Sequence, residues 1–160
     1  MEEIRYRPIG VIRSPFKEAE GMPIQPAAAA GIAGTVELKP EFATGLKDIE
    51  GFSHLILIYH FHRVEGYSLE VKPFLDDILH GVFATRAPRR PNPIGISVVR
   101  LVRVEGRVLH IEGVDILDGT PLLDIKPYVP EFDAVAAERT GWLAGKAGRV
   151  RGMRADGRFK

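Results

Sequence analysis

Residues 81–97 limit the possible folds of this chain more than any other stretch. They read Gly-Val-Phe-Ala-Thr-Arg-Ala-Pro-Arg-Arg-Pro-Asn-Pro-Ile-Gly-Ile-Ser. Proline fixes φ, lacks a backbone N–H and pushes the residue before it toward extended conformations. Because Asn92 stands between two prolines, this segment forms neither a helix nor a central strand. We predict a stiff, exposed connection between an apolar, strand-like run at 82–85 and a strand that begins at Ile94.

Most of the remaining chain consists of short apolar runs separated by glycine and proline. The run at 52–62 is nearly continuously apolar and predicts a central strand that is buried on both faces for part of its length. Residues 98–105 and 107–111 alternate about Gly106 and predict a β-hairpin. Strand composition also occurs at 6–13, 35–38, 114–117 and 122–125.

Helical signals are few. A helical turn is predicted near 41–49, and a long loop near 16–34, where Pro23 and Pro26 interrupt any helix start. One longer helix is predicted at 131–143, because apolar and long side chains recur there at helical spacing. Many short strands with little helix predict a mainly β protein, a barrel or a sandwich, with a short C-terminal helix.

Composition excludes several classes of protein. The chain has 160 residues and no cysteine, so disulfides and thiolate metal sites are excluded. No apolar run approaches the roughly 20 residues that span a bilayer, and the first residues lack the pattern of a signal peptide. We therefore expect a soluble, cytoplasmic protein without a membrane partner.

Positive charge is concentrated at the C-terminus. Residues 146–160 contain six basic residues and one acid, a charge of +5, which leaves −4 for the rest of a chain with a net charge of +1. We divide the chain into a folded domain, 1–145, and a basic tail, 146–160. The tail either binds a polyanion such as nucleic acid or is a solvated segment that aids solubility.

The proline-bracketed loop is the first candidate site. Arg86, Arg89 and Arg90 present planar guanidinium groups, which suit phosphate or carboxylate, and Asn92 can pair with the edge of a nucleobase. Gly95 would let a ligand approach the backbone closely. The alternative is a stiff turn with solvated arginines.

Residues 118–128 form the second candidate site. Asp124 and Lys126 have the same parity along an extended segment, so their side chains point the same way. They can bind the polar end of a small molecule, or they can form an ion pair on an edge strand. His54, His60 and His62 share one parity as well, but the first two are too far apart to hold one metal ion, so a metal site is disfavoured. The sequence contains no phosphate-binding loop and no dinucleotide-binding glycine pattern.

Taken together and in this order, five stretches resemble the YaeB/TsaA-like family, whose members include the TrmO tRNA methyltransferases. They are Ile9 to Phe16, Gln25-Pro26, Phe52 to Leu55, Gly81 to Ser97 and Asp118 to Tyr128. The resemblance implies a single-sheeted β-barrel over 1–145 that forms a homodimer and binds S-adenosylmethionine without a Rossmann fold. It also implies methyl transfer to N6 of threonylcarbamoyladenosine, next to the anticodon in certain tRNAs.

The resemblance also implies a cofactor site assembled from several segments. Carried onto this sequence, its residues are Gln25, Pro26, Ala27, His62, Arg63, Arg86, Ile96, Leu122, Leu123, Asp124 and Ile125.

Within this expected reaction, the target nitrogen must lose a proton. Asn92 would orient the base, and either Asp124 or solvent would accept the proton. Arg89, Arg90 and Lys126, with the basic tail, would contact tRNA phosphates. Two other functions stay open: a non-catalytic barrel that binds RNA or an adenosyl ligand, and a methyltransferase for small molecules. Neither dimerisation nor the methyl acceptor follows from the residues alone.

Overall fold

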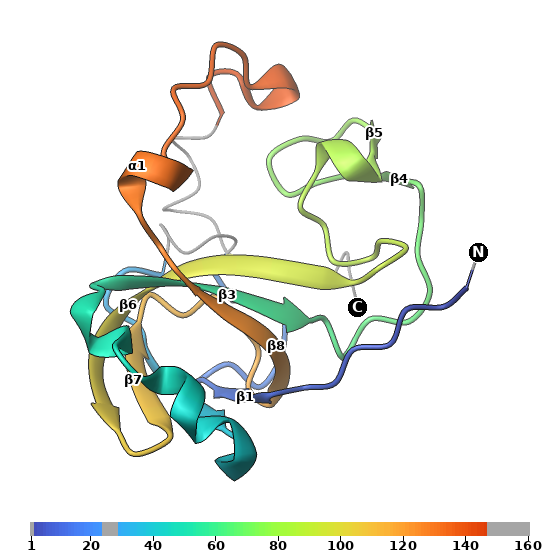
Figure 1. Cartoon of the computed structure of the whole chain (residues 1–160). Coiled ribbons are helices and arrows are strands. Elements are labelled where there is room, and N and C mark those ends of the chain that lie inside the picture. The colour runs from blue at the N-terminus through green and yellow to red at the C-terminus, as the bar shows by residue number, and fades with distance from the viewer. Residues whose placement is uncertain (1, 24–28, 147–160) are drawn as a thin grey trace.

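A computed structural model describes residues 2–23 and 29–146 of the chain. Six antiparallel strands close into one barrel in the order β1-β2-β7-β6-β3-β8 (Figure 1). Their bounds are β1 Gly10–Arg13, β2 Ala33–Leu38, β3 His54–His60, β6 Ile94–Glu105, β7 Val108–Glu112 and β8 Thr120–Pro127. The mainly β, single-sheeted barrel predicted from sequence is therefore confirmed, and the hairpin about Gly106 is the turn between β6 and β7.

The barrel is filled by one face of each strand. Along β3, Leu55, Leu57 and Tyr59 are buried, and the residues between them are only partly buried. The prediction that this strand is buried on both faces was wrong, because a closed barrel has an inner and an outer face, and its strands alternate between them. The fully buried core residues are Ile12, Val36, Leu55, Leu57, Leu109, Val114 and Leu122.

An insert between β3 and β6 stands beside the barrel. It contains a two-stranded sheet, β4 Glu70–Val71 and β5 His80–Gly81, followed by the 3₁₀ turn η4 Val82–Ala84. Val71, Val82 and Ala87 form a small core of their own. The run at 82–85 is therefore not a strand as predicted, because Val82 turns into this core while Phe83 points to solvent.

Two short helical segments, η2 Pro40–Leu46 and η3 Ile49–Gly51, lie where a helical turn was predicted. The helix predicted at 131–143 is reduced to α1 Pro130–Asp133 and a separate 3₁₀ turn, η5 Gly141–Leu143. Its apolar residues have nothing to cover, since Phe132 and Val135 are about four-fifths exposed, so no packing stabilises the longer helix. Residues 114–117 are a loop whose apolar side chains enter the core, and not a strand.

Candidate functional site

Predicted site residues of two different segments lie on one outer face of the barrel. Within the sheet, β3 lies between β6 and β8, and Ile58 of β3 is opposite both Ile96 and Asp124. Residues that are directly opposite in an antiparallel sheet share a face. The β6–β3–β8 outer face therefore brings together Ile96 and Asp124, which are 28 residues apart in sequence.

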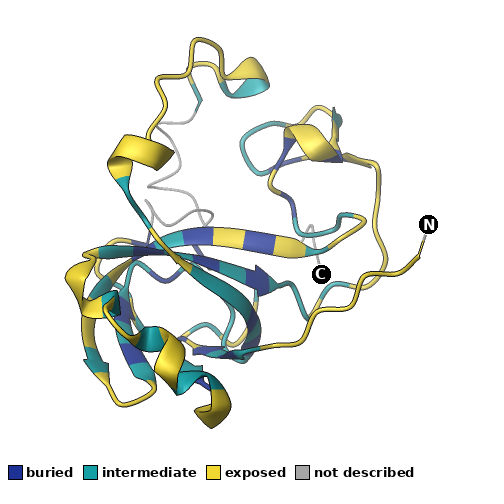
Figure 2. Cartoon of the chain, in the orientation of Figure 1, coloured by how far each residue is buried: buried dark blue, intermediate teal, exposed yellow. Residues whose placement is uncertain are grey.

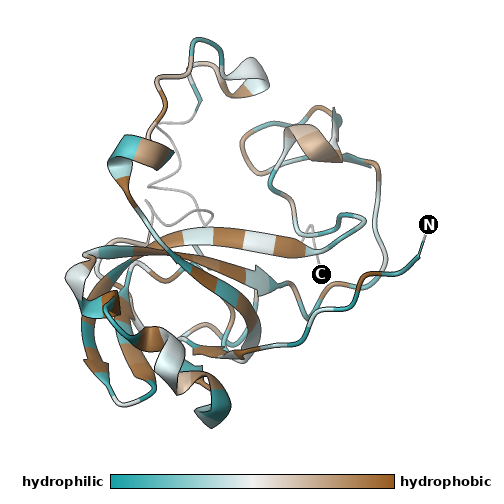
Figure 3. Ribbon diagram, in the orientation of Figure 1, coloured by the Kyte–Doolittle hydropathy of each residue, from teal (hydrophilic) through white to brown (hydrophobic). Residues whose placement is uncertain are grey.

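The first half of β6 has an inverted pattern of burial. Ile94 and Ile96 are 43% and 52% exposed, whereas Gly95 and Ser97, which alternate with them along the strand, are buried. Figures 2 and 3 show this inversion as alternating bands on β6, in which the exposed bands are hydrophobic and the buried ones are not. Large apolar side chains on the outside of a barrel mark a contact surface.

Gly95 is explained by the inside of the barrel. A Cβ atom at this position would overlap the ring of Tyr59 and lie 2.8 Å from the ring of Phe61. These two rings pack edge to face with their centroids 5.6 Å apart. The glycine therefore makes room for two aromatic side chains of the protein itself.

A hydrogen-bonded chain of three polar side chains, which the sequence analysis missed, runs from the buried face of β3 and β6 into the loop between β7 and β8. The Tyr59 hydroxyl lies 2.8 Å from Ser97 Oγ, and Ser97 Oγ donates a hydrogen bond to Asp115 Oδ1 at 2.7 Å. Because the Ser97 proton is committed to the carboxylate, Tyr59 donates to Ser97. Asp115 is the one acid in the 114–117 run, between the buried Val114 and Ile116, and this pattern was the available signal.

Burial changes the ionisation of both ends of this chain. Desolvation raises the pKa of Asp115 to about 7, although the Ser97 hydrogen bond and the charge of Arg86 oppose the shift. The pKa of Tyr59 is also raised, chiefly by burial and then by the Asp115 carboxylate. The positive charge of Arg86, the arginine predicted to bind the cofactor, thus acts on this buried chain from the adjoining loop.

Hydrogen bonds close the proline-bracketed loop on itself. Arg90 Nη1 donates to the carbonyls of Thr85 at 2.9 Å and Ala87 at 3.1 Å. The Thr85 hydroxyl donates to the Val82 carbonyl and accepts from the Ala87 N–H. The residues on both sides of Arg86 are therefore held, while Arg86 itself is exposed. One guanidinium nitrogen of Arg90, the proposed RNA contact, therefore also binds the loop backbone.

The other polar residues of this region differ in exposure. Asn92 is exposed, Arg89 is partly buried, and the Asn92 carbonyl accepts the Ile94 N–H at 2.7 Å. Just after β3, Arg63 is exposed and His62 is partly buried. His62 Nδ1 is buried without a hydrogen-bond partner in the described structure, and desolvation, followed by the charge of Arg63, lowers the pKa of the imidazole.

The predicted cofactor residues of β8 have different environments. Leu122 is fully buried in the core, and its carbonyl accepts the Ile9 N–H. The pairing of β3 with β8 is irregular between Ile58 and Tyr59, and Leu123 has no paired position there. Beyond this bulge, Ile125 packs against the core and Asp124 faces outward.

The ion pair between Asp124 and Lys126 is present. Lys126 Nζ lies 2.9 Å from Asp124 Oδ2, and both side chains are about half exposed. The recorded pairing of β8 with β1 ends at Leu122, so this end of β8 has a free edge. A hollow of about 540 Å³ opens there, and Asp124 and Ile125 form part of its wall beside η2 and η3.

The remaining sequence predictions concern other parts of the chain. Gln25, Pro26 and Ala27 lie outside the described residues, as does the basic tail after Lys146. Asp118 stabilises the turn before β8: it accepts the Ser14 N–H at 3.1 Å and pairs with Lys17 at 2.7 Å. His54 and His60 lie at opposite ends of β3.

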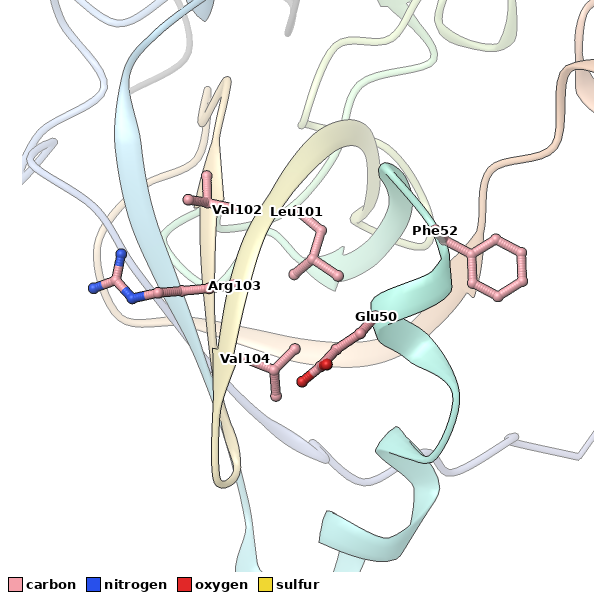
Figure 4. A pocket seen from close by; sticks show the side chains of 6 residues that line it. All are labelled: Glu50, Phe52, Leu101, Val102, Arg103 and Val104. Carbon is pink, nitrogen blue, oxygen red and sulfur yellow. The ribbon is translucent and has the colours of Figure 1, made fainter.

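A second hollow, of about 350 Å³, lies between η3 and the far half of β6 and contains none of the predicted site residues (Figure 4). In this view Glu50 points toward Val104, while Arg103 points away. Across the described ranges, no three potential metal ligands gather, and no helix is both long and apolar enough to cross a bilayer.

Several known proteins are similar to this chain in sequence and in fold. The family description "tRNA-methyltransferase O N-terminal domain" matches residues 11–134. A probable S-adenosyl-L-methionine-binding protein of Pyrococcus abyssi is 64% identical over 98% of this chain and 85% of its own length. The mouse protein named tRNA (adenine(37)-N6)-methyltransferase is 37% identical over 79% of this chain and 31% of its own.

Solved structures agree with the sequence comparison. A crystal structure of TrmO from Pseudomonas aeruginosa superposes with a TM-score of 0.75 at 46% identity, over 89% of this chain and 62% of the other. The chain thus spans about three-fifths of that protein. Since the family match extends from β1 through α1, across the whole barrel, this chain belongs to the tRNA-methyltransferase O family.

Proposed function

We propose that this protein is an S-adenosylmethionine-dependent tRNA methyltransferase that acts on N6 of threonylcarbamoyladenosine next to the anticodon. The observation that carries the proposal is the family match over the complete barrel, residues 11–134. The name of the mouse relative supports N6 of an adenine as the acceptor, and the name of the Pyrococcus abyssi relative supports the cofactor.

The residues of the outer face and the loop suit such a cofactor. S-adenosylmethionine carries a carboxylate, an ammonium group and an adenine. Arg86 is an exposed guanidinium for the carboxylate, and Asp124 is an anion for the ammonium group. The exposed Ile96 offers an apolar surface to the adenine, and His62 Nδ1 is a buried polar atom that still needs a partner.

The remaining steps require only positioning and a proton acceptor. When bound, the cofactor supplies an activated methyl group on a sulfonium. The N6 nitrogen forms the new C–N bond in line with the breaking C–S bond, and its proton leaves. Asn92, exposed at the loop tip, orients the base, and Asp124 or solvent takes the proton.

The RNA contact is expected to be electrostatic. Arg89, Arg90 and Lys126 lie on the loop and on β8, which adjoin the proposed cofactor residues, and the basic tail adds further charge. An anticodon loop is single-stranded, so its bases can leave the stack at a small energetic cost. We place this reaction in the cytoplasm, with tRNA as the partner.

Incubation with methyl-labelled S-adenosylmethionine tests the proposal. Total tRNA from a strain that lacks this gene should gain label, and mass spectrometry should find it in methylated threonylcarbamoyladenosine. tRNA that lacks the threonylcarbamoyl group is the matched control and should stay unlabelled. Cofactor binding without label in any tRNA would favour a non-catalytic barrel, and label in a small molecule alone would favour the third function.

We also propose that the chain forms a homodimer through apolar surface that the single chain leaves uncovered. Ile94 on β6 and Leu79 and Phe83 on the insert are each at least 43% exposed. Light scattering should then give twice the chain mass of 17.7 kDa. A mass of one chain at micromolar concentration would contradict the dimer.

A further inference from the structure

Four side chains join the last described part of the chain, residues 130–146, to the insert. Asp76 Oδ2 accepts from Lys146 Nζ at 2.9 Å and pairs with His80 Nε2 at 3.0 Å. The His80 ring stacks on Trp142, with centroids 4.6 Å apart and an angle of 21° between the planes. We call this group, Asp76, His80, Trp142 and Lys146, the clasp. The hydrogen bonds from His80 and then from Lys146 lower the pKa of Asp76.

The clasp also contacts the start of the proline-bracketed loop. Trp142 Nε1 donates to the Ala84 carbonyl at 2.7 Å, and Ala84 is followed by Thr85 and Arg86. Thr85 is the centre of the hydrogen bonds that close the loop on itself. A displacement of Ala84 is therefore passed directly to the backbone that presents Arg86.

Core packing does not account for this arrangement. Every residue from 130 to 141 is exposed, and Trp142, Leu143 and Lys146 are the partly buried residues of the described C-terminal segment. The segment thus crosses to the insert (Figure 1) without covering the barrel core, and it is anchored where the clasp forms. An anchor of two polar contacts, Lys146 to Asp76 and Trp142 to Ala84, and one ring stack fixes geometry more than it buries surface.

We propose that the clasp is a positioning element of the cofactor site, in which Trp142 and Asp76 hold the insert so that Arg86 is presented for binding. The inference rests on the proposed function, because it assigns Arg86 to the cofactor. Binding then costs less, since the loop need not be ordered when the cofactor arrives.

Three variants of the clasp and one control variant test the inference. Asp76→Asn keeps the Oδ1 oxygen that accepts the Asp77 N–H at 2.8 Å but removes the charge that holds His80 and Lys146. Trp142→Phe keeps a ring on His80 and loses the N–H, and Trp142→Ala loses both. Phe132→Ala is the matched control, because Phe132 is on the same segment, 80% exposed and outside the clasp.

Trp142 is the only tryptophan of the chain, so its fluorescence reports the clasp directly. We expect Asp76→Asn to shift the emission toward that of a solvated indole, and Phe132→Ala to leave it unchanged. By calorimetry, Asp76→Asn and Trp142→Ala should weaken S-adenosylmethionine binding about three- to tenfold, and Trp142→Phe should weaken it less, while circular dichroism shows that the barrel stays folded at the assay temperature. In the tRNA methylation assay, the same variants should raise the KM for S-adenosylmethionine and leave kcat at saturating cofactor unchanged.

The outcomes separate this inference from the proposed function. A wild-type protein that binds no S-adenosylmethionine contradicts the proposed function, whatever the fluorescence shows. If the wild type binds and Asp76→Asn releases the indole but binds equally tightly, the clasp does not position the site. An unchanged indole emission in Asp76→Asn also overturns the inference.

Discussion

Replacing Asp115 with asparagine is expected to stabilise the protein at pH 8 by roughly 2–4 kcal/mol and to change little at pH 4. Burial raises the pKa of this carboxyl to about 7, whereas an unfolded aspartate has a value of about 3.8. One pH unit of difference is worth about 1.4 kcal/mol. Chemical denaturation of both proteins at several pH values measures the difference.

The sign follows from proton binding. Between about pH 4 and pH 7 the native Asp115 keeps a proton that the unfolded chain has lost, so the native state binds more protons. Its contribution to stability is therefore greatest below pH 4 and is lost as the pH rises through 7. Asparagine can still accept the Ser97 hydrogen bond but has no charge to desolvate, so its advantage should grow across the same interval.

Asp118→Asn is the matched control with the opposite sign. Lys17 first, then the Ser14 N–H and Arg13, lower the pKa of Asp118, so its ionised form stabilises the native state. This variant should lose stability at neutral pH, and the loss should disappear as the pH falls below the pKa of the wild-type carboxyl. Equal behaviour of the two variants would show that the Asp115 carboxyl is not desolvated.

Replacing Arg86 with alanine is expected to weaken S-adenosylmethionine binding about 10- to 100-fold. A hydrogen bond to a charged group contributes roughly 1.5–3 kcal/mol. The fold should remain, because Arg86 is exposed and its neighbours Thr85 and Ala87 are held by other hydrogen bonds. Calorimetry measures the affinity, and circular dichroism checks the barrel.

Arg103→Ala serves as the control for the loss of one arginine. Arg103 lies on β6 beside the second hollow, pairs with Glu105 at 2.7 Å and is exposed. Its removal should leave cofactor affinity unchanged. Affinity that is equally unchanged in Arg86→Ala would remove that residue from the proposed site. The pKa of Asp115 should also rise in Arg86→Ala, because the arginine charge lowers it.

Local sequence patterns predicted the elements that local physics controls. Proline at 91 and 93 stops regular structure, and alternation with Gly106 produces the hairpin, so both features could be placed from sequence. The predicted C-terminal helix failed for a reason outside its own residues: the periodic apolar side chains face solvent, and short isolated helices are unstable in water. The parity of Asp124 and Lys126 placed the two side chains on one side of the strand, and the ion pair they form was one of the two alternatives left open by the sequence.

The composition of the candidate site depends on pairing between strands that are far apart in the sequence. The register that places Ile96 and Asp124 on either side of Ile58 depends on barrel closure and on the bulge at Leu123, neither of which the segments contain alone. Gly95 is required because the rings of Tyr59 and Phe61, from β3 and the residue after it, fill the space beside it. The pKa of Asp115 depends on burial and on Ser97 and Arg86, which come from other segments.

The sequence by itself determined that residues 86–93 form a stiff, arginine-bearing connection, because proline restricts its own backbone wherever it stands. Only the tertiary structure decided what that connection serves. Trp142, 58 residues away in sequence, donates to Ala84 and fixes the loop from outside. Such a contact exists only after the chain has folded, since it joins two segments whose own sequences specify neither partner.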